Sequence, residues 1–170
     1  LEKGILAIQG PKANEVMASL GLPHDHPYMS FVDATWNGHA LTVCRTGYTG
    51  EHGFELVIGN DGLVELFPAV LAAGAPHGLL PCGLGARDTL RTEMGYALHG
   101  QDISPSISPV EARTGWAVGW SKPAFHGRDA LVAQKSEGAA RVAWGLLATG
   151  RGIPRGHMQV LDGNRSEEHT

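Results

Sequence analysis

The sequence is poor in cysteine, in clustered basic residues and in long apolar runs. Only two of the 170 residues are cysteines, which gives neither a disulfide framework nor a zinc-site spacing. We expect Cys44 and Cys82 to be buried, reduced thiols in a cytoplasmic compartment. The net charge is −4 without a basic stripe, which argues against nucleic acid as a partner. No apolar run approaches the ~20 residues of a membrane-spanning helix, so we also expect no membrane association.

The composition is that of a globular, loop-rich protein. Hydrophobic residues make up 42% and charged residues 18% of the chain, a balance that supplies enough apolar surface for a core. The 24 glycines favour many tight turns. The chain starts without methionine or a signal-peptide pattern and enters a strand-like run at Ile5. We therefore expect it to begin inside a domain.

The most informative stretch runs from residue 47 to residue 56. Glycines at 47, 50 and 53 indicate backbone that takes positive φ or approaches another group closely. Apolar, β-prone runs at 40–44 and 54–58 flank it and predict two strands. Glu55 lies on the second strand and should share a face with Val57. Such a glutamate is either part of a solvated face or an acceptor for the N–H groups of a flat heterocycle, and its spacing leaves both readings open.

Periodicity predicts several strands and several helices in the chain. Asn37-Gly38 between two β-prone runs indicates a hairpin. Helices are expected where apolar residues recur at intervals of three and four. The expected strands are 4–9, 31–35, 40–44 and 54–58, and the expected helices are 11–20, 63–71, 86–94 and 125–135.

Several polar residues are candidates for a functional site. Arg87 falls in the first turn of the helix expected over 86–94, where the helix dipole disfavours a cation. It is therefore either a functional residue or half of an ion pair with Asp88 or Glu93. Trp116 is either a core residue or a wall on which a flat ligand stacks. No Gly-Lys-Ser/Thr follows the glycines near residue 85, which excludes a phosphate-binding loop of that type.

We predict no metal site. His24, Asp25 and His26 are consecutive, and adjacent side chains in a loop diverge. No fourth ligand is spaced nearby. A polar loop is therefore the better interpretation of these three residues.

Residues 136–138 read as a domain boundary, and the rest of the chain as an incomplete second domain. Strands are expected over 141–147 and 158–161, followed by a hairpin turn at Asp162-Gly163 with no partner strand after it. Residues 165–170 differ in pattern from what precedes them, and we expect them to be a non-native tail.

Several spaced segments of the chain match one known family, in the same order. They are Gly47-Tyr48-Thr49-Gly50-Glu51, Gly53-Phe54-Glu55, Gly85 to Arg91, Asp102-Ile103, Pro109 to Ala112, Trp116 and Gly152-Ile153-Pro154-Arg155. Over nearly all of residues 1–164 these motifs resemble the glycine cleavage system T protein family of aminomethyltransferases. The resemblance implies an α+β fold, with a folate-binding domain of mainly antiparallel strands and packed helices over 1–135 and the start of a C-terminal β-barrel domain over 136–164. It also implies tetrahydrofolate as cofactor and the lipoylated H protein as partner.

The resemblance also implies roles for individual residues. Glu55 corresponds to the family carboxylate that holds the pterin, Arg87 to the arginine of the folate site, and Trp116 to a residue of the site wall. The family's catalytic aspartate lies upstream of the region matched by Leu1, so no catalytic residue is expected in this chain. His52 and Gln101 depart from the residues common in the family.

Three other readings remain open. The chain could be the folate-binding domain of a sarcosine- or dimethylglycine-oxidising enzyme, which would carry a dinucleotide fingerprint outside this sequence. It could be a non-catalytic folate-binding module. It could also be a globular fragment without a ligand of its own.

Overall fold

The computed structural model describes residues 2–152, 154–156, 158–162 and 165–167. The chain divides into two compact units, one ending at Tyr96 and the other starting at Ala97, and each is described by itself. The boundary expected after residue 135 stays a prediction. Among the described residues, no helix is long and apolar enough to cross a membrane.

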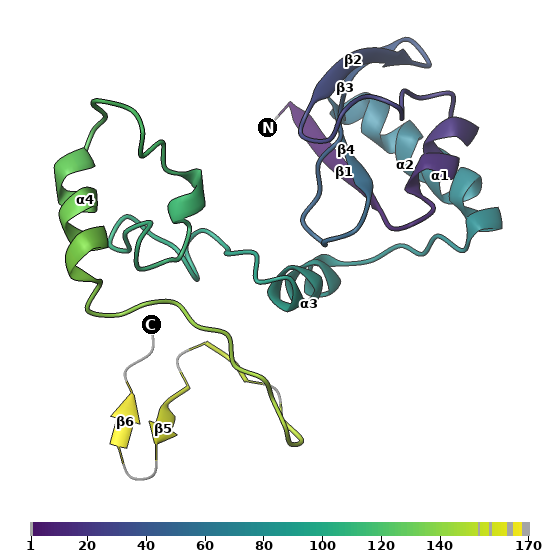
Figure 1. Ribbon diagram of the computed structural model, residues 1–170. Coiled ribbons are helices and arrows are strands. Elements are labelled where there is room, and N and C mark those ends of the chain that lie inside the picture. Colours follow the sequence, from purple (N-terminus) through teal and green to yellow (C-terminus); the bar gives the residue numbers. More distant parts are fainter. Residues whose placement is uncertain (1, 153, 157, 163–164, 168–170) are drawn as a thin grey trace. The chain divides into compact units, whose positions relative to one another are not determined.

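A four-stranded antiparallel sheet forms the centre of the first unit (Figure 1). Its strands lie in the order β1-β4-β3-β2, so β1 and β2 are the edge strands. The hairpin predicted at Asn37-Gly38 is confirmed, since both residues have positive φ (46° and 83°) between β2 and β3. The bounds are Lys3–Gln9 for β1, Phe31–Trp36 for β2, His39–Cys44 for β3 and Gly53–Gly59 for β4.

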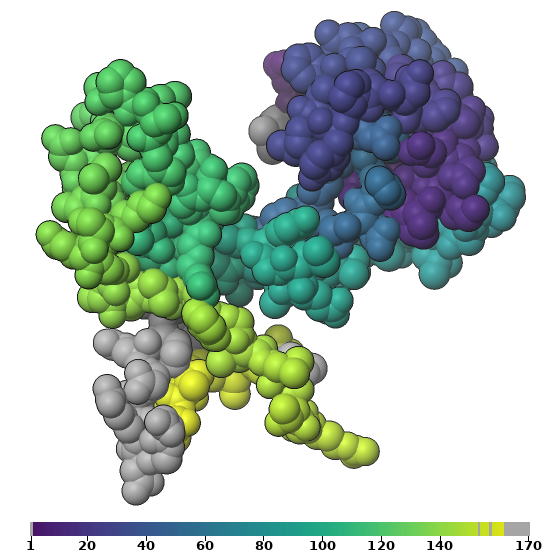
Figure 2. All heavy atoms as spheres, in the orientation of Figure 1, coloured from purple at the N-terminus to yellow at the C-terminus, as the bar shows by residue number. Residues whose placement is uncertain are grey.

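Two helices cover one face of this sheet and form the core with it. Helix α1 spans Ala13–Ser19 and α2 spans Asn60–Gly74, and both contact β4. In Figure 2 the atoms of the sheet and of these two helices, coloured purple to blue, pack closely against one another. The buried apolar residues of this core include Val16, Met17, Leu41, Val43, Phe54, Leu56, Ile58, Leu66 and Val70.

The opposite face of the sheet is half-exposed and carries Glu55. Burial alternates along β4, with Phe54, Leu56 and Ile58 buried and Glu55 and Val57 partly exposed. The prediction that Glu55 shares a face with Val57 is therefore confirmed. Cross-strand pairing places Ala7 of β1 and Cys44 of β3 directly opposite Glu55, so these residues lie on the same face.

Helix α3 follows the sheet and completes the first unit. It spans Leu84–Glu93, which confirms the helix expected over 86–94 with a start two residues earlier. Helix α2 also starts earlier than expected, because Asn60 to Gly62 form its first turn and do not merely end β4. Asp61 there complements the positive end of the helix dipole. A short 3₁₀ helix, η1 (Ala75–His77), lies between α2 and α3.

The second unit contains few regular elements. They are the 3₁₀ helix η2 (Gly115–Ala117), helix α4 (Arg128–Glu137) and the antiparallel strands β5 (Val160–Asp162) and β6 (Arg165–Glu167). Helix α4 confirms the helix expected over 125–135 and begins only after Gly127, whose φ of 81° is not helical. All buried hydrophobic residues among those described belong to the first unit.

Two expectations for the C-terminal part are wrong. Residues 141–147 form no strand, because their alternating pattern has no partner strand to satisfy its backbone groups. The strand near 158–161 was expected to lack a partner, yet β5 pairs with β6. The hairpin turn predicted at Asp162-Gly163 reaches beyond the described residues. Whether 165–170 are a non-native tail stays a prediction.

We expect Leu56→Ala to lower the free energy of unfolding of the first unit by about 2–5 kcal/mol, because it leaves a cavity in a fully buried site on β4. Urea denaturation followed by circular dichroism measures this loss. Val57→Ala is the matched control, since it shortens the neighbouring side chain on the half-exposed face. Equal losses for the two variants would contradict the assignment of the two faces.

Candidate functional site

The loop between β3 and β4 is anchored by the side-chain amide of Gln9, the last residue of β1. Gln9 Nε2 donates to the backbone oxygens of Thr46 (3.2 Å) and Phe54 (3.1 Å). Gln9 Oε1 accepts from the hydroxyl of Thr49 at 3.2 Å. A single half-buried carboxamide therefore joins both ends and the middle of the loop.

The three glycines of this loop have the roles predicted for them. A methyl group at Gly47 or at Gly53 would overlap the amide end of Gln9, so a side chain at either position would displace this amide from its hydrogen bonds. Gly50 has a φ of 81°, which a side chain disfavours. The sequence predicted a close approach, and the structure identifies Gln9 as the group approached.

Glu55 is held at the end of the loop by a second polar contact. Thr46 Oγ1 donates a hydrogen bond to Glu55 Oε2 at 2.6 Å. The other carboxylate oxygen, Oε1, lies 3.8 Å from Nη2 of Arg87. The Glu55 side chain is 24% exposed, so the carboxylate is neither buried in the core nor fully solvated.

Arg87 reaches Glu55 from the first turn of α3 and is supported by Tyr48. The guanidinium carbon of Arg87 lies 4.9 Å from the centroid of the Tyr48 ring, a cation–π arrangement. Tyr48 in turn stacks on Tyr96 at 5.7 Å and donates its hydroxyl hydrogen to the Tyr96 backbone oxygen. The structure thus brings together Glu55 and Arg87, which are 32 positions apart in the sequence.

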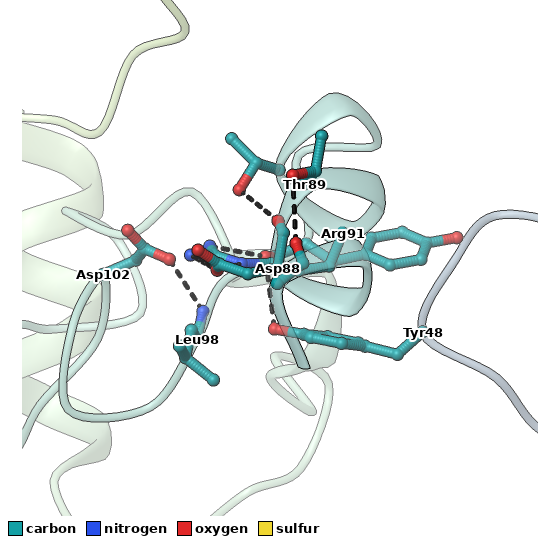
Figure 3. Close-up of polar contacts among 9 residues, drawn as sticks. Tyr48, Asp88, Thr89, Arg91, Leu98 and Asp102 are labelled. Carbon is teal, nitrogen blue, oxygen red and sulfur yellow. Dashed lines mark hydrogen bonds and ion pairs between the residues drawn. The ribbon is translucent and has the colours of Figure 1, made fainter. Parts of the chain in front are cut away.

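The alternative ion pair of Arg87 with Asp88 does not form, because Asp88 has another partner. Asp88 Oδ1 accepts from Nε (2.8 Å) and Nη2 (2.6 Å) of Arg91, a residue buried on α3 (Figure 3). Figure 3 shows the Tyr48 ring beside this pair of residues. Asp88 and Arg91 therefore stabilise the helix that presents Arg87.

A hollow of about 560 Å³ lies beside the loop, and Arg45, Thr46 and Gly47 are among the residues that line it. Glu55 and Arg87 do not line it. His26, at its wall, is 8% exposed, and neither ring nitrogen has a hydrogen-bond partner in the part of the chain that the structure describes. Within those residues, no three His, Cys, Asp or Glu side chains gather to hold a metal ion.

The two cysteines differ, and the expectation that both are buried is wrong for Cys82. Cys82 is exposed in the segment before α3, whereas Cys44 is half-buried opposite Glu55. Burial raises the pKa of the Cys44 thiol, and the nearby carboxylates of Glu55 and Asp33 raise the pKa further. A thiolate at Cys44 would lie beside these negative charges, which favours the protonated thiol.

Trp116 belongs to the second unit and is not a core residue. It lies in η2, and its side chain is 86% exposed. Trp120, in contrast, is engaged: its Nε1 donates to the Gly115 oxygen at 2.7 Å, and its ring centroid lies 4.2 Å from Lys135 Nζ. A ligand-stacking role for Trp116 stays a prediction.

Sequence reasoning missed three residues of this site, namely Gln9, Thr46 and Tyr48. The signal available for Gln9 was a glutamine at the end of an apolar strand together with glycines that require a close neighbour. The sequence could not connect these signals, because Gln9 bonds to residues 37 and 45 positions away.

Comparison with known proteins gives consistent matches. Residues 2–122 match the GCVT N-terminal domain family. The aminomethyltransferase of Frankia alni is 60% identical over 157 residues, covering 92% of this chain and 43% of that protein. The aminomethyltransferase of Mycobacterium tuberculosis (strain H37Rv) is 52% identical over 162 residues, covering 95% of this chain and 44% of that protein.

A solved structure supports the same relationship. The crystal structure of glycine cleavage system aminomethyltransferase T from Bartonella henselae matches with a TM-score of 0.73 at 35% identity, covering 84% of this chain and 39% of that one. The chain thus spans less than half the length of the relatives and of the structure that it matches.

We expect iodoacetamide to modify Cys82 before Cys44 in the folded chain, because the raised pKa of Cys44 lowers its thiolate fraction near neutral pH. Peptide mass spectrometry after short exposures measures the two rates. In the Cys82→Ser variant, the rate of modification at Cys44 should increase only when the pH exceeds the pKa of an ordinary thiol. Unfolding in urea is the control and should make the two rates similar. Equal rates in the folded chain would contradict the shift.

Proposed function

Because the chain belongs to the family of GCVT N-terminal domains, we propose that it supplies the folate-binding part of a cytoplasmic aminomethyltransferase of the glycine cleavage system. The enzyme would take the aminomethyl group from the lipoyl arm of the H protein and pass it to tetrahydrofolate, giving methylene-tetrahydrofolate and ammonia. The names of the relatives and of the matching structure support this activity. In the same proposal, residues 1–135 belong to the folate-binding domain and 136–164 begin a β-barrel domain.

One observation carries the proposal: a glutamate and an arginine from separate elements meet at the end of one sheet face. Glu55 comes from β4 and Arg87 from α3, with 3.8 Å between Oε1 and Nη2. A carboxylate accepts paired N–H groups of the kind found on an aminopyrimidinone edge. A guanidinium fork binds carbonyl or anionic oxygens in its plane. Together they present both halves of a complementary surface for a pterin.

The residues present fit such a ligand. Among the residues that the structure describes, Glu55 receives one hydrogen bond, from Thr46, and a carboxylate has about four acceptor positions. The contact with Arg87 is too long for a hydrogen bond, so acceptor positions remain for ligand N–H groups. The Arg87 side chain is 42% exposed while one side lies on the Tyr48 ring. In this proposal Trp116, which the family resemblance assigns to the site wall, is also a folate-binding residue.

In this proposal the chain orients the reactants and does not itself transfer protons. Bound tetrahydrofolate supplies the nitrogen that accepts the one-carbon unit. Holding two reactants in place can contribute roughly 7–11 kcal/mol in the best cases. The acid–base group would be the family aspartate upstream of the region matched by Leu1. Asp88 is committed to Arg91, and Asp102 accepts from the Leu98 backbone N–H, so neither is assigned that role.

The names of the relatives favour this activity over the alternatives. Those reported above are aminomethyltransferases, whereas a sarcosine- or dimethylglycine-oxidising enzyme would also carry a flavin domain. A non-catalytic folate-binding module would keep Glu55 and Arg87 without the transfer reaction. Binding tests on these two residues address the part that all folate-binding readings share.

We expect Glu55→Ala to weaken tetrahydrofolate binding by roughly 1.5–3 kcal/mol, the range for hydrogen bonds to a charged group. Calorimetry measures it on a full-length protein built by joining this chain to the segments of the Frankia alni relative outside the matched region. Glu65→Ala is the control, because it removes an exposed carboxylate on α2. Unchanged affinity in Glu55→Ala would remove Glu55 from the site.

Arg87→Lys should also weaken tetrahydrofolate binding, by about 1 kcal/mol or more, because an ammonium group cannot reproduce a planar fork. The same calorimetric measurement on the joined protein tests it. Arg128→Lys makes the same chemical change at the start of α4 and serves as the control. If the lysine form binds as tightly as the parent, Arg87 does not contact the ligand.

A further inference from the structure

We propose that Thr46 is a positioning residue, which fixes the Glu55 carboxylate in the orientation that a pterin requires. The inference rests on the proposed function, since it concerns the same carboxylate. The contact that carries it is the 2.6 Å hydrogen bond from Thr46 Oγ1 to Glu55 Oε2. Both side chains are only partly accessible to solvent, so water competes less with this bond than at an open surface.

The hydroxyl of Thr46 restricts a torsion that is otherwise soft. The terminal torsion of a glutamate is broad and roughly two-fold, so an unanchored Glu55 carboxylate could rotate freely. With Oε2 bound to Thr46, the other oxygen, Oε1, is directed to the side on which Arg87 Nη2 lies. The acceptor edge of the carboxylate is thereby fixed before any ligand arrives, which lowers the ordering cost of binding.

The same hydrogen bond keeps the Glu55 carboxylate from closing to hydrogen-bond distance of Arg87. Their closest atoms are 3.8 Å apart, whereas a direct charge-assisted pair closes to about 2.7–2.9 Å. Thr46 holds the carboxylate from one side, and the Tyr48 ring holds the guanidinium from the other. Removing the Thr46 hydroxyl would let the two charges pair directly and occupy the atoms that the ligand needs.

Gln9 places Thr46 relative to Glu55. Its Nε2 donates to the backbone oxygen of Thr46 and also to that of Phe54, the residue directly before Glu55. One amide group therefore fixes the backbone on both sides of the Thr46–Glu55 bond. Gly47 and Gly53 permit this arrangement because neither has a side chain to displace Gln9.

Thr46→Val keeps the shape of the side chain and removes the donor. We expect tetrahydrofolate binding to weaken about 3- to 10-fold in the joined full-length protein, less than a full charged hydrogen bond to the ligand would give. Thr46→Ser restores the hydroxyl and should bring the dissociation constant back close to that of the parent. In a Glu55→Ala background, Thr46→Val should cause no further loss, because the group that it positions is absent.

Thr42→Val is the matched control. Thr42 lies on the same sheet face, and its hydroxyl donates to Asp33 Oδ1 at 2.8 Å, away from Glu55. This variant should leave the dissociation constant unchanged, and urea denaturation of all variants reports any loss of fold. An equal loss in Thr42→Val, or no rescue by serine, would show a structural effect and overturn the inference.

The outcomes also separate this inference from the proposed function. If Glu55→Ala weakens binding and Thr46→Val does not, the positioning role of Thr46 is wrong and the folate site stands. If Glu55→Ala itself leaves binding unchanged, the proposed site is wrong, and the role of Thr46 within it falls too.

Discussion

The conformation of the loop between β3 and β4 depends on one carboxamide. Gln9 closes the loop between β3 and β4 by binding backbone oxygens on both sides and a hydroxyl in the middle. Each bond alone is worth on the order of 1 kcal/mol. Together they define a single loop conformation, and the glycines at 47 and 53 leave the space that the Gln9 side chain fills. The loop then carries Thr46 and Tyr48 to the two charged residues.

The sheet separates stability from chemistry across its two faces. Phe54, Leu56 and Ile58 point into a core closed by α1 and α2. Glu55 sits between two of these residues in the sequence and points the other way. Its backbone is therefore fixed by the core, while its carboxylate meets groups from the loop and from α3. A rigid strand that carries a half-exposed acceptor is suited to binding a flat ligand with little reorganisation.

Alternation alone does not make a strand, as the second unit shows. Residues 141–147 have an alternating pattern of side chains that is typical of a strand. Their one described backbone–backbone hydrogen bond, however, runs from Ala143 N to Glu111 O. Residues 165–167, which have no strand-like pattern, do form β6 because β5 offers them a partner. A strand forms only together with a partner, because its backbone hydrogen bonds run to a neighbouring strand and not within the strand itself. The same reasoning explains why the hairpin at Asn37-Gly38, with both partners adjacent, could be predicted.

The sequence by itself determined the local elements and singled out two residues of the candidate site. The spacing of apolar residues that indicates a helix or a strand is visible within a short stretch of sequence. The strand β4, the helix α3 and the sheet face of Glu55 could therefore be predicted. Local features singled out Glu55 and Arg87, and the family resemblance suggested their roles. That the two side chains meet was visible only in the fold. Only the tertiary structure decided that Gln9 fills the space beside the glycines, that Thr46 binds Glu55 and that Tyr48 supports Arg87. These contacts join residues far apart in the chain, and no local pattern specifies which distant group will fill a given space.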